Sequence, residues 1–192
     1  MLVKALEVGY LQTNCYLVTD EDTMDTAIID PGAVSNVILD YVESNRLKVR
    51  GILVTHGHFD HCMGLEEVQA ALGCPVYMSH KDLTEEINSA FYAGWEVDPP
   101  DETVFVSEGD EIECGSLTFD VLETPGHTPG GADFPLPGLP VHRGHPVPHV
   151  LRPVRFSRQQ RSGAEPLPGK APGSGGGLRG LSRPREQHDP GV

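Results

Sequence analysis

The stretch at residues 53–61, L-V-T-H-G-H-F-D-H, is the part of this chain that decides its fold. Its first three residues end a run at 49–55 (VRGILVT) that is rich in apolar and β-branched residues. This run predicts a buried strand. Three histidines and an aspartate then fall within six residues, on a turn before a helix predicted to begin at Gly64. Imidazole and carboxylate groups are the ligands that borderline divalent ions such as Zn²⁺ prefer. The stretch therefore predicts a metal site at the end of a buried strand.

The ligand-type residues of this stretch are His56, His58, Asp60 and His61. In an extended turn His56 and His58 point to the same side, and the following bend offers Asp60 and His61 to a neighbouring point, so one segment can serve two ions. A single histidine at a strand end is usually a solvated loop residue. Side chains crowded in this way, however, would repel one another or stay unsatisfied without a cation. We therefore interpret the cluster as metal-binding.

A fifth candidate ligand follows another predicted strand, at residues 117–123. The chain then reads T-P-G-H-T-P-G, which places His127 on a tight turn rich in proline and glycine. Strand ends are where a sheet presents side chains to a ligand without disturbing the packed core. We therefore expect His127 to join the first cluster. His80, in S-H-K-D at the start of a predicted helix, fits a helix cap or a surface residue instead.

Short apolar runs alternate with helical patterns through the first 130 residues, which predicts an α/β fold with helices outside the sheets. Besides the two strands already described, strands are predicted at 2–8, 14–18, 26–29, 75–78, 104–106 and 111–114. Helices are predicted at 36–47, with Ser35 as the cap, from Gly64 to Leu72, and at about 81–92.

Composition divides the chain of 192 residues near residue 131. Through Gly126 there are 24 acidic residues against 5 basic ones, and from His127 onward 4 against 9, so the two parts contribute −19 and +5 to the net charge of −14. From Gly131 onward, 11 prolines and 11 glycines fall among 62 residues, a share typical of unpatterned, disordered sequence. We therefore expect an incomplete domain at 1–130 and a disordered tail at 131–192.

The acidic front part disfavours a nucleic-acid partner, because phosphate binding needs clustered lysine and arginine. A small-molecule substrate is expected instead, and the sequence indicates no oligomeric state. The chain opens without a basic start and a long apolar run, so we expect no signal peptide, no membrane span and a cytoplasmic location. Four cysteines without a C-x-x-C pair suit reduced thiols, and Cys62 is expected to be a buried free thiol.

Four motifs together resemble those of the metallo-β-lactamase-fold hydrolases. They are NCYLV at 14–18, IIDPG at 28–32, HGHFDH at 56–61 and ETPGHTPGG at 123–131. Within that superfamily the chain is most similar to the hydroxyacylglutathione hydrolase (glyoxalase II) group of thioesterases. The resemblance implies an αββα sandwich, two sheets flanked by helices, of which this chain carries the N-terminal part.

The resemblance also implies a metal site. His56, His58 and His127 would hold a first ion, and Asp60 with His61 would belong to a second. The cofactor would be zinc, as one or two ions, with iron as an alternative. Asp30 matches an acidic residue that supports the site, although an aspartate capping a turn is equally compatible. The implied activity is cleavage of a thioester or ester by a hydroxide that the metal activates.

Two other interpretations stay open. Mononuclear iron persulfide dioxygenases share the H-x-H-x-D-H pattern and a similar fold, so they are the alternative enzyme class. A non-catalytic or misfolded fragment is the other alternative. Residues lost after 131 would have supplied much of the second sheet, and their loss would expose apolar faces and strand edges.

The family's pattern stops at residue 131. The group needs a bridging aspartate in a G-D-T stretch one strand further on and a final histidine, and this sequence shows neither. Asp133 is too close to His127 to leave room for an intervening strand. Prolines interrupt the helical spacing of the tail's histidines, so we expect no ligand role for His142, His145 and His149.

A frameshift between about Gly131 and His142 explains the missing part. Residues 142–157 read HRGHPVPHVLRPVRFS, and one permitted coding of them, read one base later, gives T-G-D-T-L-F-R-M-S-C-G-R-S-D-F. That string resembles the family's stretch with the bridging aspartate, at about the expected distance. Enrichment in proline, glycine and arginine is what a GC-rich gene yields out of frame. A natural proline-rich disordered tail is the alternative. We therefore interpret the chain as a family member of impaired activity.

Overall fold

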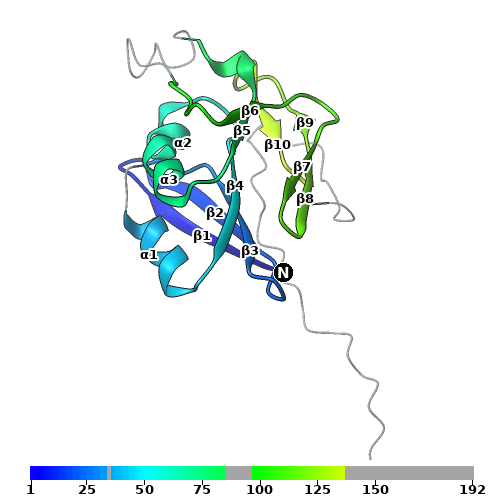
Figure 1. Ribbon diagram of the computed structural model, residues 1–192. Helices are drawn as coiled ribbons and strands as arrows, with labels where there is room; N and C mark the ends of the chain where they lie inside the picture. The colour runs from blue at the N-terminus through cyan, green and yellow to red at the C-terminus, as the bar shows by residue number, and fades with distance from the viewer. Residues whose placement is uncertain (34–35, 85–96, 137–192) are drawn as a thin grey trace, which may run out of the picture. The chain divides into compact units, whose positions relative to one another are not determined.

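The computed structural model describes residues 1–33, 36–84 and 97–136. These residues form a six-stranded sheet, two two-stranded sheets and three short α-helices (Figure 1). In the large sheet the first three strands run antiparallel and the last three continue parallel to the third. Its strands, in spatial order, are β1 (Leu2–Val8), β2 (Thr13–Thr19), β3 (Asp25–Ile29), β4 (Lys48–Leu53), β5 (Val76–Met78) and β6 (Thr103–Phe105).

The central strands of the large sheet are buried on both faces. In β2, Cys15 and Leu17 belong to one apolar core, whereas Tyr16 and Val18 belong to another. Successive side chains of a strand point to opposite faces, so a continuous apolar run fills both cores at once. The large sheet is therefore the wall between two hydrophobic cores.

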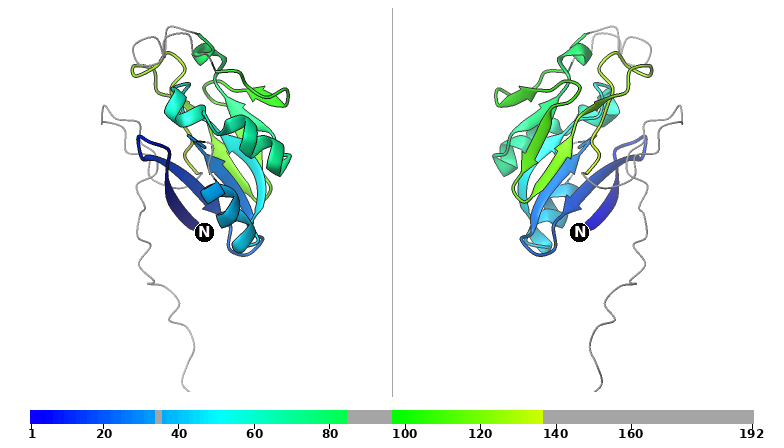
Figure 2. Two further views of the ribbon diagram at one scale, coloured as in Figure 1. Left: turned by 90° about the vertical axis from the view of Figure 1, so that its left-hand side faces the viewer. Right: turned by 90° about the vertical axis from the view of Figure 1, so that its right-hand side faces the viewer.

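Helices cover one face of the large sheet and small sheets cover the other (Figures 1 and 2). The helices are α1 (Asn36–Ser44), α2 (Phe59–Cys62) and α3 (Leu65–Leu72). The small sheets pair β7 (Glu111–Cys114) with β8 (Leu117–Asp120), and β9 (Leu122–Glu123) with β10 (Ala132–Asp133). The predicted α/β sandwich is confirmed as helix, sheet and sheet layers, and the part of the chain described here contains no second helical layer.

Helix α1 ends three residues before the predicted end at Leu47. Arg46 adopts a left-handed backbone with φ 54°, and its N–H donates to the Glu43 carbonyl at 3.0 Å. The Leu47 N–H donates to the Val42 carbonyl at 3.0 Å, which completes a Schellman cap. Leu47 packs against the helix-side core from beyond this cap, which explains why it fitted the apolar spacing. The expected cap residue Ser35 lies outside the described residues.

Two other predicted elements differ from the structure. The strand predicted at 117–123 divides at Val121 into β8 and β9, because β8 pairs with β7 whereas β9 pairs with β10. At the predicted polar helix the structure has a 3₁₀ turn, η1 (His80–Asp82), and residues 85–92 lie outside the described part. The one-turn helix α2 was not predicted.

The packed part of the chain continues a few residues past the predicted boundary at 131. Strand β10 pairs with β9, and Phe134 and Leu136 are buried in the core beneath the small sheets. The expected disordered tail, which includes His142, His145 and His149, lies outside the described residues from 137 onward. Among the helices described, none combines the length and apolar character needed to cross a bilayer.

Candidate metal centre

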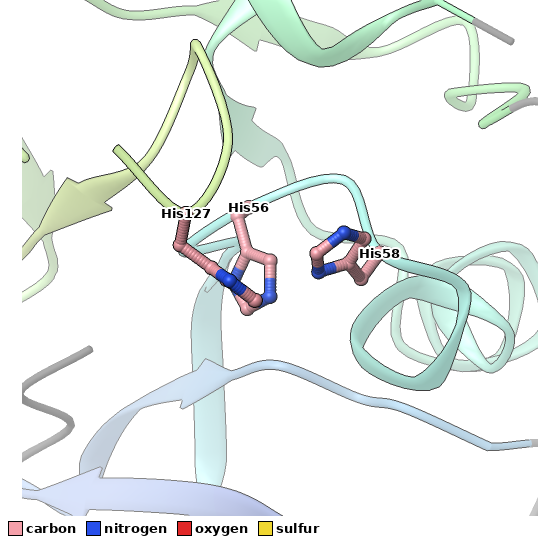
Figure 3. Close-up of side chains that lie close together, drawn as sticks. All are labelled: His56, His58 and His127. Carbon is pink, nitrogen blue, oxygen red and sulfur yellow. The ribbon is translucent and has the colours of Figure 1, made fainter. Parts of the chain in front are cut away.

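Three of the five predicted ligands converge on one point. His56 and His58 lie on the loop between β4 and α2, and His127 lies on the loop between β9 and β10. One ring nitrogen from each lies within 4.8 Å of those of the other two. Figure 3 shows the three rings gathered around a common space. The structure thus brings together histidines that are far apart in the sequence, and we call them the histidine cluster.

The convergence follows from strand pairing. Because β9 pairs with β10, the T-P-G-H-T-P-G segment is a hairpin loop, closed by the Thr124 N–H on the Gly131 carbonyl at 2.7 Å. The Ala132 N–H donates to the Thr55 carbonyl at 2.8 Å, which ties the end of the hairpin to the residue before His56. His127 is therefore brought beside the loop that follows β4.

A hydrogen-bonded chain behind the cluster sets the protonation of His56. The buried carboxylate of Asp30 accepts the Thr55 N–H and the Thr55 hydroxyl, each at 2.7 Å. The single hydroxyl proton of Thr55 is used in the hydrogen bond to Asp30, so at the 2.9 Å contact the hydroxyl oxygen accepts from His56 Nδ1. This pattern assigns the proton of the neutral ring to Nδ1 and leaves the lone pair on Nε2.

The donor atom left by this arrangement fits a metal ion. His56 Nε2 is buried and has no hydrogen-bond partner within the described part of the chain. A buried polar atom without a partner costs free energy, and His58 and His127 offer the same kind of atom beside it. Three imidazoles with one direction left open are a ligand set that suits a divalent ion.

Burial keeps the two inner histidines in the form that binds metals. Burial, followed by repulsion from His61, lowers the pKa of His56 to about 3. Burial also lowers the pKa of His58, with His127 as the next cause. Since only the neutral imidazole can ligate a metal, both rings are ready to bind at neutral pH.

Asp60 and His61 lie next to the histidine cluster but outside the group of three. His61 Nδ1 donates to Asp30 at 2.9 Å, and its Nε2 lies 3.5 Å from a carboxylate oxygen of Asp60. Burial alone would lower the pKa of His61, but the hydrogen bond and charge of Asp30 outweigh it and raise the pKa. The Thr13 hydroxyl donates to Asp60 at 2.8 Å. These two predicted ligands therefore form a separate pair on α2.

Asp30 connects the pair to the cluster. Its side chain is fully buried, and its backbone has a left-handed φ of 55°, which aspartate tolerates better than most residues. This turn at the end of β3 lets one carboxylate accept from both Thr55 and His61. Asp30 thus contacts both the residue behind His56 and the Asp60–His61 pair.

One residue of the site was missed by the sequence analysis. Asp82 is 1% exposed and lies at the end of η1, where its carboxylate accepts hydrogen bonds from both histidine-bearing loops. In the sequence it falls within the helix predicted at about 81–92. A signal that could have found it is its place shortly after a buried strand, β5, that runs parallel to β4.

Of the other residues singled out from the sequence, the structure describes His80 and Cys62. His80 is exposed, as expected for a surface residue. Cys62 is a buried free thiol, as predicted, and its S–H donates to the His56 carbonyl at 3.4 Å. The tail's histidines at 142, 145 and 149 lie outside the described residues.

Known proteins are similar to this chain over its N-terminal two thirds. The family described as the metallo-beta-lactamase superfamily matches residues 8–134. An uncharacterized protein of Aquifex aeolicus is 42% identical over 135 residues, which are 68% of this chain and 63% of that protein. A hydroxyacylglutathione hydrolase of Bdellovibrio bacteriovorus is 36% identical over 60% of this chain and 40% of its own length.

A solved structure agrees with the sequence matches. The crystal structure of TTHA1623 in a di-iron-bound form is 32% identical, with a TM-score of 0.57 over 70% of this chain and 67% of that one. The two sequence relatives are longer than the matched region, and the chain spans less than two thirds of either.

Proposed function

The chain belongs to the metallo-beta-lactamase superfamily, and from that premise we propose that the histidine cluster is the metal site of a hydrolase that cleaves thioesters or esters. The observation that carries the proposal is the buried Nε2 of His56, which has no hydrogen-bond partner among the described residues and lies close to two further imidazoles. The relative named hydroxyacylglutathione hydrolase favours the thioester class. His56, His58 and His127 are the proposed ligands of the first ion, and Asp60 and His61 those of a second.

Zinc is the proposed ion, because three imidazoles with an open fourth position are a catalytic zinc set. Iron is the alternative, supported by the solved structure described as di-iron-bound. A divalent ion supplies a coordinated water of lowered pKa and polarises a substrate carbonyl. The chain's own residues orient the ligands: Thr55 holds His56 by its Nδ1, and Asp30 holds Thr55.

The burial of the three histidines indicates where substrate enters. His56 is 4% exposed, His58 is half-buried and His127 is exposed, so the cluster opens toward solvent on the His127 side. A small-molecule substrate can reach it from there. A cysteine nucleophile is disfavoured, because all four thiols are buried and burial raises the pKa of each.

We propose that this chain carries the activity in weakened form. Among the described residues, Asp60 and His61 supply only two protein ligands for a second ion, too few for a zinc site. One ion per chain and slow turnover are the expected state. Because the cluster gathers a single group of three ligands, a mononuclear iron persulfide dioxygenase is the second candidate.

The test uses the full chain stripped of metal and then loaded with zinc or with ferrous iron. We expect one zinc per chain and slow hydrolysis of a hydroxyacyl-glutathione thioester, both lost in His56→Ala. Oxygen uptake with a persulfide and one bound iron would favour the dioxygenase instead. Turnover near the ordinary enzyme value of about 10 s⁻¹ would contradict the impairment. No metal binding, together with the absence of cooperative unfolding, would favour a non-catalytic fragment.

A further inference from the structure

A single buried carboxylate, that of Asp82, joins the two loops that form the histidine cluster. Its Oδ2 accepts the Gly57 N–H at 2.9 Å and the Thr128 hydroxyl at 2.7 Å. Its Oδ1 accepts the Gly130 N–H at 2.6 Å. Gly57 lies between His56 and His58, whereas Thr128 directly follows His127. The same side chain therefore holds the backbone of both ligand-bearing loops.

The loops approach Asp82 as closely as a polypeptide backbone allows. A Cβ at Gly57 would lie 2.7 Å from the Asp82 carbonyl oxygen and 2.8 Å from its Cβ. A Cβ at Gly130 would lie 2.7 Å from Asp82 Oδ1. Only glycine fits at these two positions, so the two loops pack closely against Asp82. A shift at Asp82 must move the loops with it.

The contacts require a carboxylate rather than another small polar group. An ionised carboxylate is an acceptor only, and here it meets three donors. An amide in its place would turn an N–H toward one of those donors. In the described part of the chain, no lysine or arginine forms an ion pair with Asp82. A buried charge paired only with neutral donors is costly, which favours a role for that charge beside a cation site.

We propose that Asp82 is a positioning residue that sets the separation of the His127 nitrogen from those of His56 and His58. The inference rests on the proposed metal site. Among the described residues, Asp82 forms no hydrogen bond with any of the three imidazole rings. Asp82 acts through the backbone of Gly57 and Gly130 and through the hydroxyl of Thr128. Loss of its acceptors should let the two loops move apart without removing any ligand.

The test measures the geometry of a bound ion in the full chain. Co²⁺ replaces the native metal, and its visible absorption reports the number and arrangement of ligands. We expect Asp82→Asn to weaken Co²⁺ binding by about tenfold or more, in the range found when groups that orient metal ligands are changed, and to alter the Co²⁺ spectrum. Thr128→Val, which removes only the hydroxyl, should act in the same direction to a smaller extent. Thr128→Ser keeps the hydroxyl and should retain the native spectrum.

The controls separate this inference from the metal site itself. If the native chain binds no more Co²⁺ than His56→Ala, the metal site and hence the proposed function are wrong. If the native chain binds Co²⁺ but Asp82→Asn and Thr128→Val keep its affinity and spectrum, the positioning role is wrong. The metal-free variants could instead unfold at a lower temperature while their Co²⁺ spectra stay native. Asp82 would then stabilise the fold without positioning the ligands, and the inference would be overturned. The threonine pair decides the question if Asp82→Asn does not fold.

Discussion

At the scale of single residues, the histidine cluster makes a direct prediction about metal content. Replacing His56 or His127 with alanine leaves two imidazoles, one fewer than a catalytic zinc site needs. We expect both variants to retain less zinc than the native chain when metal is measured after dialysis. His80→Ala is the control, because it removes an exposed imidazole outside the cluster. Unchanged zinc in both cluster variants would exclude the cluster as the metal site.

A second prediction concerns the pH dependence of the metal-free protein. The pKa of His56 falls from 6.5 to about 3 on folding, chiefly through burial. Between pH 6.5 and about 3 the folded state therefore binds fewer protons than the unfolded state. The contribution of His56 to the free energy of unfolding is fully present above pH 6.5 and is lost as pH falls toward 3. His61 acts with the opposite sign: burial alone would lower its pKa, but Asp30 raises it. Its contribution is present below the unfolded pKa and lost as pH rises through the folded one.

The measurement compares the native chain with His56→Asn in urea unfolding at several pH values. Between pH 6.5 and about pH 4.5, the native chain should lose free energy of unfolding more steeply than the variant. The excess slope is bounded by about 1.4 kcal/mol per pH unit, the value for one proton. Parallel curves for the two proteins would contradict the buried, neutral state of His56.

The site could be predicted from the sequence only where a motif carries the ligand itself. Three histidines and an aspartate within six residues are visible along the chain, and strand ends explain why His127 joins them. Asp82 could not be found in this way. Its partners are two backbone N–H groups and one hydroxyl, which carry no pattern. Thr128 and Gly130 lie on the loop formed by the pairing of β9 with β10, and Gly57 follows β4, which pairs with β5.

At the scale of elements, strands were easier to predict than helix ends. Both faces of β2 and β3 are buried, so their apolar runs are continuous and have clear ends. The end of α1 depends instead on a cap in which Arg46 has a left-handed backbone. Arginine is not a residue type that predicts this conformation. Helix α2 is a single turn, too short for an apolar period to appear.

The cap of α1 gives an element-scale prediction. Arg46 is exposed, and its left-handed backbone is a conformation that glycine adopts without the penalty of a Cβ. We expect Arg46→Gly to stabilise the protein by about 1 kcal/mol in urea unfolding. Arg46→Ala keeps the Cβ and removes the rest of the side chain, so it should be nearly neutral. A glycine variant no more stable than the alanine variant would show that the backbone at Arg46 is not left-handed in solution.

At the scale of the whole molecule, the large sheet positions the site and the small sheets complete it. Strand β4 leads into His56 and contributes side chains to the cores on both sides of the sheet. Strand β9 leads into His127 and pairs with β10, whose Ala132 lies in one of these cores. This layering could be predicted because apolar runs and helical patterns alternate along the chain. The point where the packed part ends could not, because β10 is two residues long and has no pattern of its own.

The frameshift interpretation makes the last prediction, and it concerns residues outside the described part of the chain. The histidine cluster is the proposed site of one ion, and the Asp60–His61 pair would need a bridging carboxylate to hold a second. Restoring the frame between codons 131 and 142, so that T-G-D-T-L-F is translated, supplies that aspartate in the stretch where the family resemblance expects it. A carboxylate shared by two ions holds them close enough to act together on one water. The repaired product should therefore bind two metal ions per chain and hydrolyse thioesters.

Both frames are expressed side by side, and each is analysed for metal per chain and for hydrolysis of a hydroxyacyl-glutathione thioester. The chain as written should bind one ion and turn over slowly, because the three proposed ligands of its first site are intact. In the repaired product the second ion should be lost first on dialysis against a chelator, since fewer histidines hold it. His56→Ala in the repaired frame serves as the control for metal-dependent hydrolysis. An early stop codon in that frame, or two bound ions without thioester turnover, would show that the tail is not a shifted reading of a hydrolase.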